Sequence, residues 1–196
     1  MTSFTSFMTI FSHPLSMLAY KEGGMKLKGY VHVYTGDGKG KTTAALGLSV
    51  RAACAGLRVF IGQFLKGTSV SELKLKEFFR NIEIVQYGTS EFVVGRPSEE
   101  QIKKAKEGLQ DARERLISGR YDVVVLDELC VAIYFGFFSR EEIEDLLSVR
   151  PENVELVITG RYAPEWLIEK ADLVTEMKEV KHYYREGIGA RRGIEY

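Results

Sequence analysis

The sequence predicts an α/β fold in which helices cover both faces of a mostly parallel β-sheet. From residue 25 onward, short apolar and β-branched stretches alternate with segments whose apolar residues recur every three or four positions. This alternation is typical of parallel strands joined by helices. With 196 residues the chain is long enough to bury a substantial core, and we expect a single domain over residues 25–196.

The first 24 residues do not share this pattern. Thr, Ser, Phe and Met alternate there without a helical period, and the basic start and long apolar centre of a signal peptide are missing. We expect residues 1–24 to form an N-terminal arm, and two interpretations of it stay open. In the first, Met25 is the natural start and the arm is not native. In the second, the arm is native and folds over the active site or a neighbouring subunit.

The strands and helices follow in order from residue 29. The predicted strands cover residues 29–34, 57–64, 82–87, 121–126, 154–159 and 173–177, and the predicted helices cover residues 42–55, 72–79, 98–119 and 163–170. Gly56 closes the first helix, where a left-handed residue is favoured. Ser98 and Ser139 each precede a Gln or Glu by three positions, which is the pattern of a capping box, so a further helix begins after Ser139. The basic, glycine-rich tail from residue 181 predicts a loop that closes over another part of the molecule.

A glycine-rich segment joins the first predicted strand to the first helix. It consists of Thr35, Gly36, Asp37, Gly38, Lys39, Gly40, Lys41, Thr42 and Thr43. Glycines let backbone N–H groups turn toward an anion, and the helix N-terminus and Lys41 add positive charge. Thr42 offers a hydroxyl to a magnesium ion. We therefore predict a phosphate-binding loop and a P-loop NTPase fold of RecA-like architecture.

Polar residues follow two later strands at the edge of the sheet where ligands of parallel α/β folds bind. Asp127 comes directly after an apolar strand, and we predict that it holds Mg²⁺, directly or through water, together with Thr42. Glu128 could activate a nucleophile, contact a metal-bound water or bind a second substrate. Arg161 follows the strand 154–159 and is predicted to contact phosphates or an acidic substrate, with a surface salt bridge as the alternative.

The composition excludes several classes of protein. The 27 basic and 27 acidic residues balance, which does not favour a nucleic-acid partner, and no apolar run reaches the roughly 18 residues of a membrane helix. Cys54 and Cys130 lie far apart outside any CxxC motif, so we expect reduced thiols in a cytoplasmic protein. Neither a nucleophile elbow nor a metal-binding histidine pair is present, so covalent hydrolase chemistry has no support.

With these segments in place, the chain resembles the phosphate-loop family of ATP:corrinoid adenosyltransferases from about residue 29 to the C-terminus. The segments that carry the resemblance are residues 34–45 (YTGDGKGKTTAA), 63–67 (QFLKG), 126–129 (LDEL), 159–164 (TGRYAP), 171–176 (ADLVTE), 181–182 (KH), 187–188 (GI) and 190–195 (ARRGIE). Thr35, at the position where the usual phosphate loop has its first glycine, is the form that this family uses.

The resemblance implies a specific reaction. In this family, the cobalt(I) of a reduced corrinoid attacks the 5′-carbon of ATP and the whole triphosphate leaves. Residues 35–43 would then bind ATP, and Lys41, Glu128 and Arg161 would be catalytic. The resemblance also implies Mg²⁺, a flavoprotein that reduces the cobalt, and a homodimer.

The corrinoid contacts are expected from Phe92, Tyr134, Phe135, His182 and Arg191. The family commonly has a Phe and a Trp in the loop that corresponds to residues 88–97, where they pack on the lower face of the corrin. Here Phe92 takes the place of the Phe, and Val93 or Val94 lies where the Trp would be. The preferred substrate stays open between cobalamin and a corrinoid that precedes it in synthesis.

Two other functions stay open on the residues alone. One is a different phosphate-loop enzyme, such as a small-molecule kinase or an ATPase, and the other is an ATP-gated carrier that delivers a corrinoid. A switch GTPase is not favoured because no Asn-Lys-x-Asp segment is present.

Overall fold

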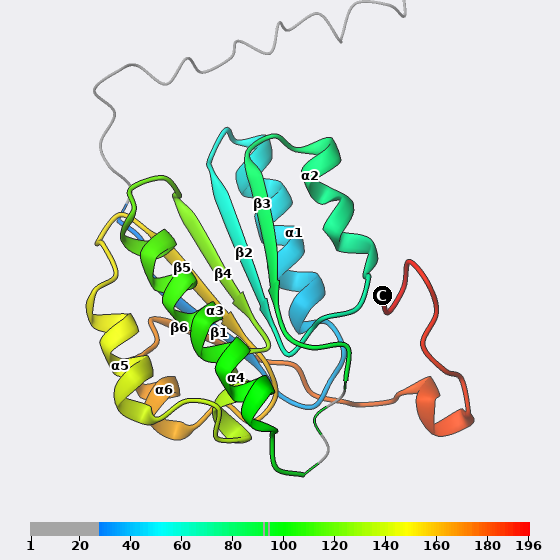
Figure 1. Ribbon diagram of the computed structural model, residues 1–196. Helices are drawn as coiled ribbons and strands as arrows, with labels where there is room; N and C mark the ends of the chain where they lie inside the picture. The colour runs from blue at the N-terminus through cyan, green and yellow to red at the C-terminus, as the bar shows by residue number, and fades with distance from the viewer. Residues whose placement is uncertain (1–27, 92, 94) are drawn as a thin grey trace, which may run out of the picture.

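The computed structural model describes residues 28–91, 93 and 95–196 (Figure 1). The predicted N-terminal arm, residues 1–24, and Phe92 in the loop 88–97 lie outside the described residues. Within the described ranges, no helix is both long and apolar enough to cross a membrane.

Six parallel strands form one sheet in the order β3-β2-β4-β5-β1-β6. The strands are β1 (Val31–Thr35), β2 (Val59–Phe64), β3 (Ile82–Tyr87), β4 (Val123–Asp127), β5 (Glu155–Thr159) and β6 (Leu173–Glu176). The predicted α/β fold with a parallel sheet is confirmed, and each observed strand boundary lies within two residues of its predicted position. One strand, β5, separates the strand before the phosphate loop from the strand that ends in Asp127.

Helices cover both faces of this sheet, as predicted. The α-helices are α1 (Lys41–Cys54), α2 (Leu75–Phe78), α3 (Glu99–Ile117), α4 (Leu129–Tyr134), α5 (Arg140–Ser148) and α6 (Glu165–Lys170). Figure 1 shows α3, α4, α5 and α6 on the near face of the sheet and α1 and α2 on the far face. Two 3₁₀ helices, η1 (Ser71–Lys74) and η2 (Tyr183–Glu186), complete the described elements.

The core divides into two layers because side chains alternate across the sheet. On β4, Val124 and Leu126 face the layer under α3, α4 and α5, whereas Val123 and Val125 face the layer under α1. All four side chains are buried. The central strand is therefore apolar on both faces, which explains why its sequence is continuously apolar rather than alternating.

The helix ends follow the local sequence signals. Ser98 and Ser139 each form the predicted capping box, with both reciprocal hydrogen bonds present. Gly56 has a φ of +84°, the left-handed conformation expected after α1. The predicted helix 72–79 is only partly correct, because its first turn is the 3₁₀ helix η1 and only Leu75–Phe78 is α-helical.

Candidate active site

The phosphate loop connects β1 to α1 and depends on its glycines. Gly36 and Gly40 have φ values of +95° and +120°, which side chains rarely tolerate. The loop also packs against the chain that follows β6, because the Gly38 N–H donates to the Met177 carbonyl at 2.6 Å. A Cβ on Gly36 or Gly38 would come within 2.6 Å of that same carbonyl oxygen. The loop shape is therefore imposed by its sequence and by its neighbour.

Lys41 folds back into this loop. Its Nζ donates to the carbonyls of Gly36 and Gly38, both at 2.7 Å, and the residue is buried. Burial, followed by the nearby Arg161, lowers the pKa of Lys41, while the Glu128 carboxylate opposes the shift. The ammonium group thus lies where the loop would surround an anion.

Thr42 and Asp127 meet although 85 positions separate them in the sequence. The Thr42 hydroxyl donates to Asp127 Oδ1 at 2.8 Å, and Thr159, at the end of the intervening strand β5, donates to the same oxygen at 2.7 Å. Asp127 is only 1% exposed. The two predicted magnesium ligands are therefore adjacent.

This pair suits an ion that arrives with phosphates. Among the described residues, no group of three or more His, Cys, Asp or Glu side chains could hold a metal by itself. Magnesium usually takes one or two carboxylates and completes its shell with water and substrate phosphate oxygens. A hydroxyl and a carboxylate beside a phosphate loop fit that donor set.

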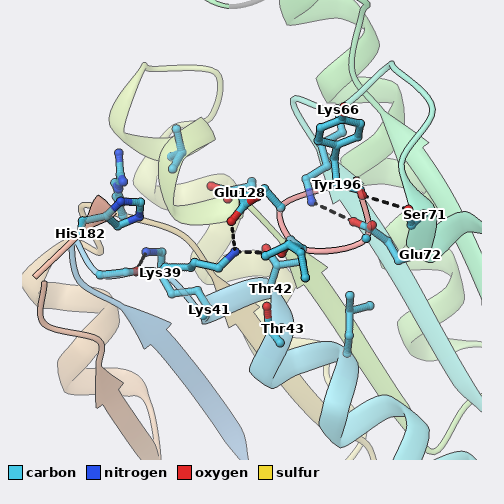
Figure 2. Close-up of a pocket in the computed structure, with 18 of the residues that line it drawn as sticks. Lys39, Lys41, Thr42, Thr43, Lys66, Ser71, Glu72, Glu128, His182 and Tyr196 are labelled. Carbon is cyan, nitrogen blue, oxygen red and sulfur yellow. Dashed lines mark hydrogen bonds and ion pairs between the residues drawn. The ribbon is translucent and has the colours of Figure 1, made fainter. Parts of the chain in front are cut away.

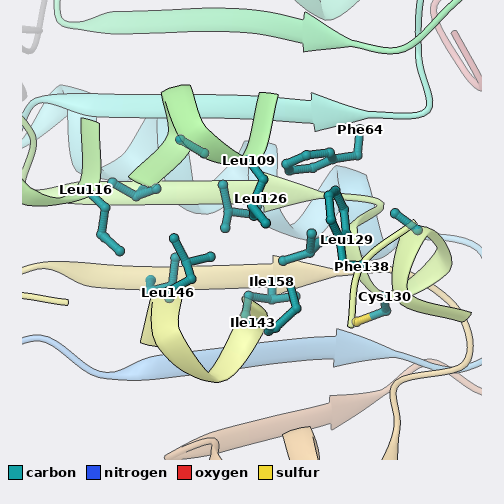
Figure 3. Close-up of a cluster of buried hydrophobic side chains, with 14 of the residues drawn as sticks. Phe64, Leu109, Leu116, Leu126, Leu129, Cys130, Phe138, Ile143, Leu146 and Ile158 are labelled. Carbon is teal, nitrogen blue, oxygen red and sulfur yellow. The ribbon is translucent and has the colours of Figure 1, made fainter. Parts of the chain in front are cut away.

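Glu128 follows Asp127 in an unusual backbone conformation. Its φ is +62°, and its N–H donates to the Thr159 hydroxyl at 3.0 Å. The next residues, Leu129 and Cys130, are the first two of α4 and are fully buried in the core, which fixes the position of the turn (Figure 3). Burial, together with the charge of Asp127, raises the pKa of Glu128.

Lys41, Thr42 and Glu128 line a cavity of about 830 Å³, which we call the main cavity (Figure 2). Its wall includes Gly38, Lys39, Gly40, Lys41, Thr42, Thr43, Glu128, Phe135, Arg161 and His182. The Arg161 guanidinium also donates to the Asp37 carbonyl at 3.3 Å. The volume lies in the range of small-molecule and cofactor sites, and one end of the cavity carries the helix N-terminus and the lysines that an anion requires.

Comparison with known proteins identifies the family. A model of the family described as ATP:corrinoid adenosyltransferase BtuR/CobO/CobP matches residues 27–196. The chain belongs to this family.

Its relatives include the corrinoid adenosyltransferase of Escherichia coli K12, which is 35% identical over 170 residues, 86% of each chain. The corrinoid adenosyltransferase of Pseudomonas aeruginosa is 35% identical over 174 residues, 86% of this chain and 84% of the relative. The corrinoid adenosyltransferase CobA of Salmonella typhimurium is 34% identical over 170 residues, 86% of both. These matches confirm the family resemblance that the sequence motifs predicted.

Three of the nine predicted ATP-binding residues do not line the main cavity of this adenosyltransferase. Thr35 is buried, and its hydroxyl accepts from the Ala163 N–H at 3.3 Å. Gly36 lies under the chain after β6. Asp37 instead lines a separate cavity of about 540 Å³, which also includes Arg161 and Arg185.

The predicted corrinoid residues separate into three groups. Phe135 and His182 line the main cavity. Tyr134 does not line it; its side chain is 60% exposed, and its ring packs against the ring of the lining residue Tyr162, with centroids 4.3 Å apart. Arg191 does not line it, and packs over the Tyr183 ring at 4.8 Å. Phe92 lies outside the described residues.

The C-terminal tail, residues 181–196, closes over the main cavity as the sequence predicted. Lys39 Nζ donates to the Ile194 carbonyl at 2.9 Å and lies 3.3 Å from the Glu195 carboxylate. At the other end, the Ser71 hydroxyl donates to the Tyr196 carbonyl at 2.9 Å. Hydrogen bonds from Tyr183 and Arg191 hold the pKa of Glu195 at about 2. Lys39 of the phosphate loop is therefore paired with the tail.

The sequence predicted no role for three polar residues at this site, Gln63, Lys66 and Glu72, although Gln63 and Lys66 lie in the QFLKG segment that carries the family resemblance. Lys66 and Glu72 line the cavity, and Gln63 is buried beside Asp127. A signal was present, because Gln63 is a polar residue inside an otherwise apolar strand. The register pairs Gln63 of β2 with Asp127 of β4, a contact that requires the strand order.

Proposed function

We propose that this protein transfers the 5′-deoxyadenosyl group of ATP to the cobalt(I) of a reduced corrinoid and releases triphosphate, in the synthesis or salvage of adenosylcobalamin. One observation carries the proposal within the family: the phosphate loop, with Thr42 bonded to the buried Asp127, lines the same cavity as the aromatic rings of Phe135, Tyr162 and Tyr196. The first part suits a triphosphate with its metal, and the second suits a large flat macrocycle.

The bond changes define what the protein must do. The cobalt electron pair forms a bond to C5′, the C5′–O bond breaks, and its electron pair leaves with the triphosphate. The nucleophile belongs to the corrinoid, so a protein general base is not required. The work of the protein is to align C5′ with cobalt and to stabilise the charge that grows on the leaving group.

We assign these tasks to the residues around the phosphate loop. Lys39, Lys41 and the loop amides would stabilise the triphosphate, since a cation and oriented N–H groups act most strongly in a partly buried site. Thr42 and Asp127 would hold Mg²⁺, which when bound neutralises charge on phosphate oxygens. Glu128 and Arg161 would contact ATP from the cavity wall.

The remaining assignments concern the second substrate and the partners. Tyr134, Phe135 and His182 would contact the corrinoid near the mouth of the cavity, with Phe92 and Arg191 as further contacts. An electron-donating flavoprotein would supply the cobalt(I) state, and the protein would act as a homodimer. We assign the reaction to the cytoplasm, where the free Cys54 and Cys130 would stay reduced.

The test is anaerobic incubation of the protein with ATP, Mg²⁺ and chemically reduced cobalamin, followed by the visible spectrum. We expect the cobalt(I) spectrum to be replaced by that of a light-sensitive alkylcobalamin. ATP consumption without this spectral change would indicate a kinase or ATPase instead, and tight corrinoid binding without turnover would indicate a carrier.

A further inference from the structure

The carboxylate of Asp127, the predicted metal ligand, contacts a lysine side chain in this structure. Lys66 Nζ lies 2.7 Å from Asp127 Oδ2 (Figure 2 shows Lys66 on the cavity wall). Lys66 follows β2, the neighbour of β4, which brings its side chain to the end of β4. With an ammonium nitrogen 2.7 Å from a carboxylate oxygen, the contact is an ion pair.

Four hydrogen-bond donors contact the two carboxylate oxygens of Asp127. Oδ1 accepts from the hydroxyls of Thr42 and Thr159, and Oδ2 accepts from Lys66 and, at 3.2 Å, from Gln63 Nε2. Two carboxylate oxygens have about four lone-pair sites, so the group has little capacity left. A divalent cation can approach Asp127 closely only if one donor moves away.

Of these donors, Lys66 is the one that can move away from Asp127. Gln63 and Thr159 are 0% exposed and held in the sheet, whereas the Lys66 side chain is 22% exposed and lines the cavity. Its Nζ also lies 3.4 Å from Glu72 Oε1, which accepts from Gln63 at 2.9 Å. Lys66 can therefore leave Asp127 and keep an anionic partner.

We propose that Lys66 is a positioning residue that neutralises Asp127 while ATP is absent and yields the carboxylate to the divalent cation only when ATP is bound. The proposal rests on the proposed Mg·ATP site. An ammonium and a dication beside one carboxylate repel each other, so Lys66 opposes binding of the metal alone. The phosphates of ATP attract both cations, so nucleotide and metal binding become coupled.

The test measures binding of Mn²⁺, as a paramagnetic substitute for Mg²⁺, to the nucleotide-free protein by the loss of the free-ion EPR signal. Lys66→Met should bind Mn²⁺ more tightly than the wild type, by about 5- to 150-fold, the usual range of coupled sites. Lys66→Arg keeps the charge and should bind like the wild type. Lys106→Met, which removes the lysine of the surface pair with Glu142, is the matched control and should also bind like the wild type.

Adding Asp127→Asn to Lys66→Met should abolish the gained affinity, which assigns it to this carboxylate. Lys66→Gln keeps a hydrogen-bond donor for Asp127 and gives the same comparison if Lys66→Met does not fold. Equal Mn²⁺ affinity in wild type and folded neutral variants would overturn the proposal. Because the assay contains no corrinoid and no turnover, that result would leave the proposed adenosyl transfer unaffected.

Discussion

At the scale of residues, Lys41 illustrates how the nucleotide-free loop is kept intact. Its ammonium bonds to two carbonyls of its own loop, and its pKa is lowered because burial and Arg161 disfavour the charge. A bound triphosphate would stabilise the charged form of Lys41, because a negatively charged partner of the ammonium group would replace two neutral carbonyls. Lys41 is therefore expected to act mainly on the leaving group.

Replacing Lys41 tests this role. We expect Lys41→Ala to slow cobalt alkylation by at least about 10²–10³-fold, the usual effect of losing one preorganised donor to developing charge. The rate would be followed by the visible spectrum under anaerobic conditions at saturating ATP. Lys103→Ala, on the exposed side of α3, should keep the wild-type rate. Near-normal alkylation by Lys41→Ala would refute the assignment.

Local sequence signals identified residues that the structure brings together, because Thr42 contacts Asp127 as expected for strand ends at one edge of the sheet; the roles of these residues stay predictions. The loop from Thr35 to Thr43 and the Asp127 carboxylate follow from motifs and from the rule that strand ends share an edge. Lys66 could not be assigned in the same way, because its partner depends on which strand lies beside β2. Phe92 stays a prediction.

At the scale of elements, α3 shows that one glycine can be required inside a helix. Gly108 is buried, and a Cβ there would lie 2.4 Å from Cγ of the Tyr87 ring. The Tyr87 hydroxyl is held by Asp111 of the same helix, so the ring cannot easily move. Gly47 in α1, in contrast, is exposed with open space where a Cβ would lie.

The two glycines give a matched pair of stability predictions. Alanine gains about 1 kcal/mol over glycine in a helix interior, whereas overpacking costs about 1–3 kcal/mol. We expect Gly47→Ala to raise the free energy of unfolding by about 0.5–1 kcal/mol. Gly108→Ala should lower it by up to about 2 kcal/mol, because the clash exceeds the helix gain. Urea unfolding measures both, and stabilisation by Gly108→Ala would contradict the packing of α3 on β3.

Element prediction succeeded where the signal lies within a few residues. The capping boxes at Ser98 and Ser139 are local patterns, and both formed as predicted. The segment 72–79 was predicted as one helix, but Glu72 is drawn to Gln63 and Lys66 across the cavity wall, and its turn is 3₁₀. A tertiary contact overrode a weak helical signal.

At the scale of the whole molecule, the strand order assembles the site. The carboxyl ends of β1, β2, β4 and β5 carry the phosphate loop, Lys66, Asp127 and Thr159, which come from distant parts of the sequence. The tail then closes the same edge through Lys39 and Ser71. The sequence predicted that the tail would cover something but not what, because a glycine-rich segment has no periodicity that defines a partner.

In the proposed reaction, the phosphate loop holds the triphosphate as a leaving group rather than as a phosphoryl donor. The most direct measurement is ³¹P NMR of the quenched products after single turnover with ATP, Mg²⁺ and reduced corrinoid. We expect one tripolyphosphate for each cobalt–carbon bond formed, with the three phosphorus atoms still joined. ADP or orthophosphate in that amount, in place of tripolyphosphate, would contradict it.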